Sequence, residues 1–289
     1  MILFVKRSFH HVLHQAGKNR KTGATLLSAW LFSCAPTSSS LHAQSPERQC
    51  EAQYDLARDL FYKGDPRGAL DHARKAIELD PDHAKALYFA STVYLYFCSG
   101  SLDLRSPDCH IEEAEALARR AQKADASFRD ARNLLAQILI LRGAHTEAIA
   151  LLSPLVRDPG YAQVHLAWGN MGWAQVLSGQ LEEGIVSLQN AVAEPRFCVG
   201  HYRLGIAYEK KGALQEAEAA FTTALTTPEP DCQNLQDALF GRARVRIRQG
   251  DASNAHADLL QCRQMATDST TGKRCASLLQ VQSSSLSAP

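Results

Sequence analysis

The 289-residue sequence lacks the patterns that commonly mark an enzyme or a metal site. No Cys-x-x-Cys pair is present, and no histidine stands at a zinc-finger spacing from a cysteine. There is no glycine-rich phosphate loop, and the histidines are scattered, without a nucleophile or a paired carboxylate at a spacing that catalysis needs. We therefore predict a protein that is not an enzyme and that holds no metal and no cofactor.

Basic residues are concentrated at the N-terminus, and the rest of the chain has little positive charge. The first 33 residues carry five of the 31 Lys and Arg residues and none of the 30 Asp and Glu residues, so the remainder is mildly acidic. An acidic body without a basic stripe argues against a nucleic-acid partner. The 45% hydrophobic and 21% charged shares are those of a folded soluble protein.

The N-terminal segment has the features of a targeting sequence. A basic region through Lys21 precedes an apolar run, residues 24–32, which is too short to span a bilayer in the usual way. The run ends in Leu31-Phe32-Ser33-Cys34, which resembles the signal of bacterial lipoproteins. That resemblance implies a signal peptide over residues 1–33, a lipidated Cys34 and a lipid anchor in the outer membrane, facing the periplasm.

The competing interpretation is ordinary signal cleavage near Ala43, after Leu41-His42-Ala43, which would leave a soluble periplasmic or secreted protein. Ala35, directly after the lipidation candidate, favours the outer membrane by resemblance to bacterial lipoproteins. Residues 34–49 are rich in Ser, Pro and Gln, and we expect them to form a flexible tether.

From Cys50 onwards the sequence has a helical period, and its clearest copy runs from Pro195 to Pro228. This copy indicates two helices joined by a turn at Gly212. Small and aromatic residues mark the faces expected to pack together: Leu204, Gly205, Tyr208, Ala217, Phe221 and Ala224. This is the 34-residue pattern of the tetratricopeptide repeat (TPR). One such hairpin cannot bury its apolar faces alone, so copies should flank it.

Six copies emerge when the small residue of each second helix is aligned. The aligned residues are Ala69, Ala114, Ala148, Gly184, Ala217 and Ala255. Seven residues later stand further small or apolar residues: Ala76, Ala121, Leu155, Ala191, Ala224 and Cys262. Five residues before five of the anchors stands a turn glycine: Gly64, Gly143, Gly179, Gly212 and Gly250. We predict an all-α fold, a right-handed TPR superhelix of about six helix-turn-helix repeats with a C-terminal capping helix.

The alignment also predicts the domain organisation. The solenoid covers residues 50–282, with repeats at about 50–83, 84–128, 129–162, 165–198, 198–231 and 236–269 and a cap at 271–281. Residues 283–289 are expected to be a disordered tail. We expect the protein to be a monomer.

The eight cysteines, in a chain with an export signal, predict disulfide bonds. Three pairs are candidates: Cys98 with Cys109 around an insertion, Cys198 with Cys232 at one end of the stack, and Cys262 with Cys275 between the last repeat and the cap. Cys50 is then free or bridges something outside the chain. The alternative is that some of these residues are buried, unpaired thiols, and spacing alone does not establish the pairing.

The first helix of each TPR repeat lines the concave face, where a partner is expected to bind. The predicted groove is rich in aromatic and aliphatic side chains and includes Tyr54, Arg58, Phe61, Tyr62, Tyr88, Leu95, Tyr96, Trp173, Tyr202, Phe240 and Arg244. Such a lining favours a bound peptide or helix. The groove lacks the Lys and Asn set that certain TPRs use for a terminal carboxylate, so we do not expect that ligand. In the alternative interpretation, half of these residues are core between repeats.

Four arginines alternate along one predicted helix, in Arg242-Ala-Arg244-Val-Arg246-Ile-Arg248. A spacing of two spreads them around the helix and does not form one stripe. Arg244 and Arg248, four residues apart, are candidates for contact with an acidic partner segment. The alternative is that the whole row is solvated.

Two short motifs resemble a narrower family. They are Gly169-Asn170-x-Gly172-Trp173-Ala174 and Pro195-Arg-Phe197-Cys198-x-Gly200, the second followed by a cysteine in the next turn. Together with the lipoprotein signal, residues 34–270 resemble the pilotin lipoproteins of type IV pili, including the form known for social gliding motility. The resemblance implies that the protein assists assembly or outer-membrane localisation of the pilus secretin, with a secretin subunit as partner. The alternative is a general cell-envelope scaffold, for example one that recruits cell-wall synthesis enzymes.

Overall fold

A computed structural model describes residues 45–101, 109–232 and 235–286. The predictions on the signal peptide, on cleavage near Ala43 and on lipidation at Cys34 lie outside these residues. Over the described residues the chain forms thirteen α-helices and one 3-10 turn, and no strand. The all-α prediction is therefore confirmed. None of the helices in these ranges combines the length and the apolar character that crossing a membrane requires.

The helices divide into two compact units. The N-terminal unit contains α2 (Pro46–Tyr62), α3 (Pro66–Leu79), α4 (Ala84–Ser101) and α5 (Ile111–Ala124). The C-terminal unit contains α6 (Arg129–Leu141), α7 (His145–Leu155), α8 (Val164–Leu177), α9 (Leu181–Ala191), α10 (Cys198–Lys211), α11 (Leu214–Thr226), η1 (Pro230–Cys232), α12 (Gln236–Gln249), α13 (Ala252–Met265) and α14 (Thr270–Leu286).

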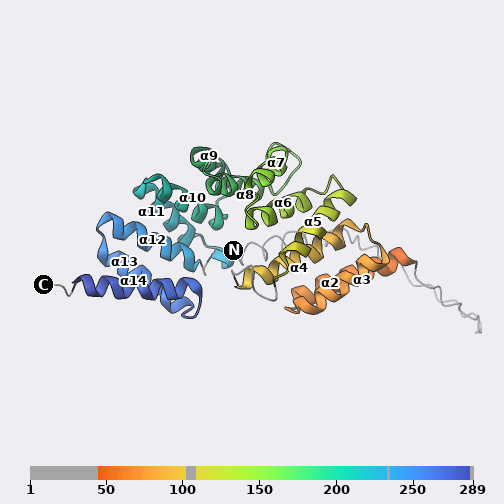
Figure 1. Cartoon of the computed structure of the whole chain (residues 1–289), viewed down its shortest axis with the longest axis horizontal. Coiled ribbons are helices and arrows are strands. Elements are labelled where there is room, and N and C mark those ends of the chain that lie inside the picture. Colours follow the sequence, from red (N-terminus) through yellow and green to blue (C-terminus); the bar gives the residue numbers. More distant parts are fainter. Residues whose placement is uncertain (1–44, 102–108, 233–234, 287–289) are drawn as a thin grey trace, which may run out of the picture. The chain divides into compact units, whose positions relative to one another are not determined.

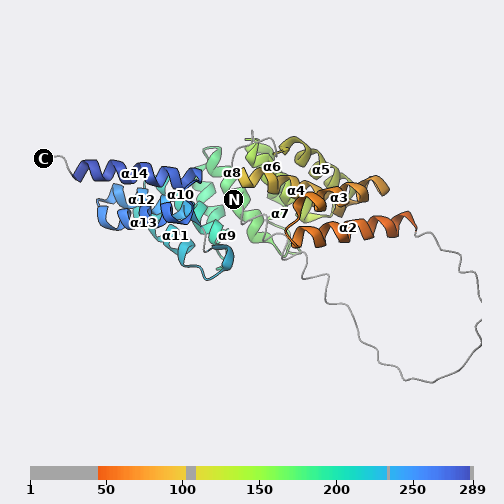
Figure 2. The ribbon, with the colours of Figure 1, turned by 90° about the horizontal axis from the view of Figure 1, so that it is seen from below.

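Within each unit, consecutive helices pack as antiparallel hairpins, and neighbouring hairpins stack on one another (Figure 1). The hairpins are α2 with α3, α4 with α5, α6 with α7, α8 with α9, α10 with α11, and α12 with α13. Helix α14 runs beside α12 and α13 in both views and covers the last hairpin (Figures 1 and 2). Each hairpin thus buries the apolar face that it cannot bury alone.

The turns inside five hairpins depend on glycine. The five turn glycines read from the sequence all adopt a left-handed backbone, with φ between 80° and 88°. A Cβ at these positions would meet no atom within 4 Å, so space is not the reason for glycine there. The backbone conformation is the reason, because side-chain-bearing residues rarely adopt it.

The small residues aligned in the sequence are the contact points between the paired helices. All six anchors are buried, and so are the six residues that follow them by seven positions. Positions seven residues apart lie on one face of a helix, so each second helix turns one stripe of small side chains towards its neighbours. This stripe sets how closely the helices approach.

Two phenylalanine rings occupy the space left by glycines in the C-terminal unit. A Cβ on Gly205 of α10 would lie 2.7 Å from the ring of Phe221, and one on Gly241 of α12 would lie 2.6 Å from it. The ring of Phe197 approaches Gly169 of α8 and Gly200 of α10 in the same way, at 2.6 and 2.5 Å. Both rings are almost fully buried. Glycine at these four positions makes room for an aromatic contact between successive hairpins.

The ends of the predicted solenoid differ from the helices observed. Helix α2 begins at Pro46, inside the predicted tether, because the Ser45 hydroxyl accepts a hydrogen bond from the Arg48 amide and proline is favoured in a first turn. Helix α14 extends to Leu286, beyond the predicted cap and into the predicted tail. Ser, Gln and Leu residues continue this helix, and its last segment contains no Gly or Pro to end it.

Three disulfides join neighbouring elements: Cys98–Cys109, Cys198–Cys232 and Cys262–Cys275, with Cα–Cα distances of 4.2, 5.9 and 6.2 Å. These are the three candidate pairs named from the sequence. Cys50 is the free cysteine of the described chain, and its buried thiol donates to the carbonyl of Ala76 at 3.3 Å. Burial, with the nearby Asp80 and Glu51 carboxylates, raises the pKa of this thiol, so it stays protonated at neutral pH.

Replacing Phe221 with alanine should destabilise the C-terminal unit strongly, because one ring fills the contact between α10, α11 and α12. We expect Phe221→Ala to lower the free energy of unfolding by about 3–5 kcal/mol. Chemical denaturation followed by circular dichroism measures this change. Gln215→Ala, at an exposed position of the same helix, should change it by no more than about 0.5 kcal/mol. Equal effects of the two substitutions would contradict this packing.

The three disulfides predict how many cysteine thiols react before and after reduction. In a Cys34→Ala variant, maleimide labelling in denaturant without reductant should add one label, at Cys50, and labelling after reduction should add seven. Intact-protein mass spectrometry counts the labels, and peptide mapping locates the first one. Three or more labels before reduction would mean that at least one of the pairs is not formed.

Candidate partner-binding site

The aromatic residues predicted to line the groove in the N-terminal unit are largely core. Tyr54, Tyr88 and Leu95 are at most 7% exposed, so the prediction that they form an open binding surface is wrong. Tyr54 meets Phe89 edge-on, with ring centroids 6.0 Å apart. These rings fill the contact between α2 and α4, the first helices of successive hairpins, where close packing leaves no open surface.

The other predicted groove residues of this unit retain exposed surface. Phe61 and Tyr96 are partly buried and meet edge-on at 5.3 Å between ring centroids. The Arg58 guanidinium lies 5.3 Å from the centroid of the Tyr54 ring and pairs with Asp55 at 3.2 Å. Tyr62 is 69% exposed at the end of α2.

The first motif of the resemblance, in the C-terminal unit, belongs to a buried polar chain across three helices. Arg203 of α10 donates to the Gly169 carbonyl and to Asn170 Oδ1, both at 3.0 Å, and Asn170 donates to Asn133 Oδ1 of α6 at 3.1 Å. Burial lowers the pKa of Arg203 to about 10, so it remains a cation at neutral pH. Its guanidinium also lies 5.7 Å from the ring centroid of the half-buried Trp173. These residues hold α6, α8 and α10 together.

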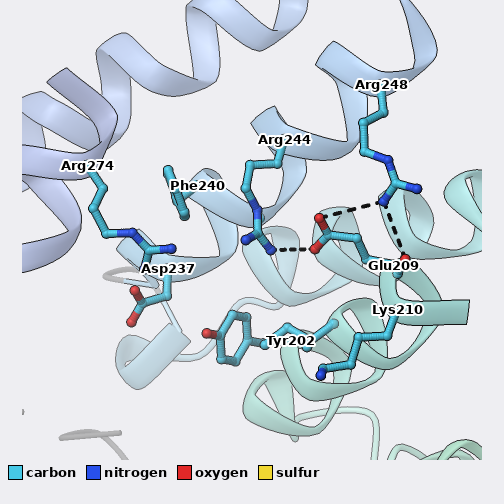
Figure 3. A pocket seen from close by; sticks show the side chains of 10 residues that line it. Tyr202, Glu209, Lys210, Asp237, Phe240, Arg244, Arg248 and Arg274 are labelled. Carbon is cyan, nitrogen blue, oxygen red and sulfur yellow. Dashed lines mark hydrogen bonds and ion pairs between the residues drawn. The ribbon is translucent and has the colours of Figure 1, made fainter. Parts of the chain in front are cut away.

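Three predicted groove residues, Tyr202, Phe240 and Arg244, meet around a pocket of about 450 Å³ between α10, α12 and α14 (Figure 3). We call it the α12 pocket. Its lining consists of Tyr202, Ile206, Glu209, Lys210, Asp237, Phe240, Gly241, Arg244, Arg248 and Arg274. Four of these side chains are cationic and two are carboxylates, so the pocket has a net positive charge although the chain after residue 33 is mildly acidic.

An aromatic ring between two guanidinium groups forms the centre of the α12 pocket. The guanidinium carbon of Arg274 lies 4.2 Å from the centroid of the Phe240 ring, and that of Arg244 lies 5.2 Å from it. Both distances suit cation–π attraction. Burial raises the pKa of Tyr202 far above its usual value, so its phenol stays neutral and can donate a hydrogen bond.

The two carboxylates of the pocket are already engaged. Glu209 forms an ion pair with Arg244, and it accepts from Arg248 through its backbone carbonyl at 3.4 Å (Figure 3). Asp237 accepts from the Thr271 hydroxyl at 2.5 Å. Arg274 and Lys210 form no ion pair with any residue that the structure describes. They are therefore the cations available to a ligand.

The alternating arginines of α12 divide into two pairs with different roles. Arg242 and Arg246 face α13, where both pair with the buried Asp258 at 2.7 and 2.8 Å. Arg246 also pairs with Glu218 of α11 at 2.8 Å. Arg244 and Arg248 face α10 and line the α12 pocket. The row is therefore neither a single stripe nor wholly solvated.

Four residues of the pocket are not predicted by the repeat pattern: Arg274, Lys210, Glu209 and Asp237. Arg274 lies on α14, which the repeat pattern assigned only to covering the last hairpin. A usable signal was present, because Cys275 must face α13 to pair with Cys262, and successive residues in a helix point about 100° apart. Arg274 therefore lies at the edge of that contact. Within the described ranges no group of three His, Cys, Asp or Glu side chains could hold a metal ion.

Family models described as tetratricopeptide repeat match three parts of the chain, residues 50–83, 110–162 and 200–229. The chain thus contains TPR repeats, and its helical hairpins have the TPR fold. Comparison with proteins of curated function gives no match.

Solved structures give the fold as well. PilW, described as a widely conserved type IV pilus biogenesis factor, is similar with a TM-score of 0.65 and 19% identity, over 78% of this chain and 97% of PilW. PilF of Pseudomonas aeruginosa is similar with a TM-score of 0.60 and 15% identity, over 81% of this chain and 99% of PilF. A chain of the APC/C hetero-tetramer Cut9–Hcn1 has a TM-score of 0.67 and 15% identity, over 83% of this chain and 43% of its own length.

Removing the charge of Asp258 should destabilise the helices that carry the pocket. Asp258→Asn leaves Arg242 without a charged partner at the interface of α12 and α13, and we expect a loss of about 3 kcal/mol in unfolding free energy. Urea denaturation measures it. Lys211→Gln, which removes the exposed ion pair with Glu182, serves as the control and should leave the midpoint unchanged. An unchanged midpoint for Asp258→Asn would show that the network does not support α12.

Proposed function

We propose that this chain is a non-enzymatic lipoprotein of the bacterial outer membrane that binds protein partners and assists assembly or localisation of the type IV pilus secretin. The observation that carries the proposal is the similarity to PilW, which extends over 97% of that type IV pilus biogenesis factor. A stack of TPR hairpins offers an extended surface that suits the handling of a protein subunit.

The cell-envelope part of the proposal is supported by two independent features. The leader carries Cys34 in a lipoprotein-like context, behind a basic and then an apolar segment. The folded part contains three disulfides, which form and persist in oxidising compartments such as the periplasm. A protein anchored there would face secretin subunits on their way to the outer membrane.

Deleting the gene should abolish heat-stable secretin multimers in the outer membrane. The reason is that unassisted subunits would not reach or assemble in that membrane. Immunoblots of unboiled outer-membrane fractions measure the multimers, and complementation with the intact gene should restore them. A Cys34→Ala variant should lose palmitate labelling and complement poorly. Normal multimers in the deletion strain would rule out the secretin role.

Co-purification separates this proposal from the alternative of a general envelope scaffold. Cross-linking in cells followed by purification of the chain should recover the secretin subunit. Recovery of a cell-wall synthesis enzyme without secretin would favour the general scaffold, which the same TPR fold would serve equally well.

A further inference from the structure

A second hollow, of about 470 Å³, adjoins the α12 pocket along α14. The second hollow is lined by Phe240, Thr270, Lys273, Arg274, Ser277 and Leu278. The two hollows share Phe240 and Arg274, so the Arg274 guanidinium lies between them, over the ring. Together they form one cleft that is cationic towards α10 and more apolar towards Leu278. We call it the α12–α14 cleft.

The charges of this cleft favour an anionic ligand. Lys273 adds a fifth cation, while Glu209 and Asp237 remain the two carboxylates of the lining. The Arg244 Nε–H is buried and has no hydrogen-bond partner among the described residues. Such a group is costly to leave unsatisfied, and an approaching acceptor would satisfy it. The chain outside the leader carries more acids than bases, so this local excess of cations runs against its overall charge.

We propose that the α12–α14 cleft binds an acidic segment of a protein partner, in which a carboxylate stands beside an apolar side chain. The carboxylate pairs with Arg274, which presents two parallel donors to a carboxylate, and with the Lys210 ammonium, because these are the two lining cations without an ion pair among the described residues. The apolar side chain lies against Phe240 and Leu278. The inference rests on the proposed function only in that it requires a protein partner, and it adds the chemistry by which that partner is recognised.

The charge of the ligand selects among the possible occupants. The chain's own leader carries five basic residues and no acidic one, so it does not match a cationic cleft. The cleft has an apolar side, at Phe240 and Leu278, and two carboxylates, Glu209 and Asp237, close to its cations. This lining suits a peptide better than a nucleic acid, because a phosphate backbone carries a negative charge at every unit. Nucleic acid and a second copy of this chain become outcomes of the test.

Fluorescence anisotropy tests the inference on the full-length chain in detergent. The probe is a fluorescein-labelled, end-capped peptide, Asp-Glu-Phe-Asp-Glu, and the comparison probes are Asn-Gln-Phe-Asn-Gln and Asp-Glu-Ala-Asp-Glu. We expect the first probe to bind most tightly, with binding that weakens as salt rises, because its carboxylates and its ring are both used. Equal binding of the Asn-Gln-Phe-Asn-Gln probe would overturn the proposal.

Matched charge variants locate the binding. Arg274→Gln and Lys210→Gln should each weaken probe binding by roughly tenfold, as expected for loss of one charge-assisted hydrogen bond. Arg263→Gln, an exposed arginine of α13 outside the lining, removes the same charge and should have no effect. Thermal unfolding verifies that all three fold. An equal loss in the three variants would show that net charge alone attracts the probe.

Two further readouts identify other occupants. The first is competition by a single-stranded oligonucleotide at the same concentration as the peptide. If the oligonucleotide displaces the peptide and binds Arg274→Gln more weakly, the ligand of the cleft is a nucleic acid and not an acidic protein segment. The second is self-association, measured by sedimentation velocity. If the chain self-associates and Arg274→Gln abolishes this association, the ligand of the cleft is a second copy of the chain. Either result overturns the proposal.

The inference and the proposed function fail in different ways. If the Arg274 and Lys210 variants bind the acidic probe as tightly as the unaltered chain does but the secretin multimers depend on the gene, the cleft assignment is wrong and the function stands. If the variants lose the probe while the deletion strain keeps normal multimers, the cleft binds acidic segments and the secretin role is wrong.

Discussion

The contact of a phenylalanine ring with two glycines is the constraint on which the C-terminal unit depends. Phe221 reaches both α10 and α12 because Gly205 and Gly241 carry no side chain in its path. The ring therefore fixes how far apart these two helices lie. The α12 pocket forms between the same helices, with Tyr202 and Phe240 on its wall. The packing core thus determines the width of the candidate binding site.

The fold could be predicted from the sequence because a solenoid repeats one physical problem. Each hairpin needs small or apolar side chains along one face of its second helix and a left-handed turn between its helices. Residues equivalent to Ala217 and Gly212 therefore recur in register along the chain. The ends of the solenoid were less predictable, since Ser45 caps a helix earlier than composition indicated. A flanking segment has no neighbouring copy against which its pattern can be aligned.

The candidate site was only partly predictable, for a reason that Tyr54 and Tyr202 illustrate. Both stand on a first helix and carry the same ring, yet Tyr54 is core and Tyr202 lines a pocket. Their difference lies in the surrounding side chains, with Phe89 packed against Tyr54 and a pocket beside Tyr202, and repeat register does not specify these neighbours. Arg274 adds a residue from outside the repeats. The motif around Asn170 is buried and holds three helices together, so its residues support packing and do not form an open surface for a partner.

The covalent bond between Cys262 and Cys275 clamps the terminal helix onto the last hairpin. In a linear stack the end modules fray first, because they have a neighbour on one side only. The N-terminal hairpin of α2 and α3 has no covalent clamp in the described chain, where its cysteine, Cys50, is unpaired. Within the described residues, helix α2 is therefore held to α3 and α4 by non-covalent contacts alone. Helix α14, which carries one side of the α12–α14 cleft, is thus the element that a disulfide holds in place at the end of the stack.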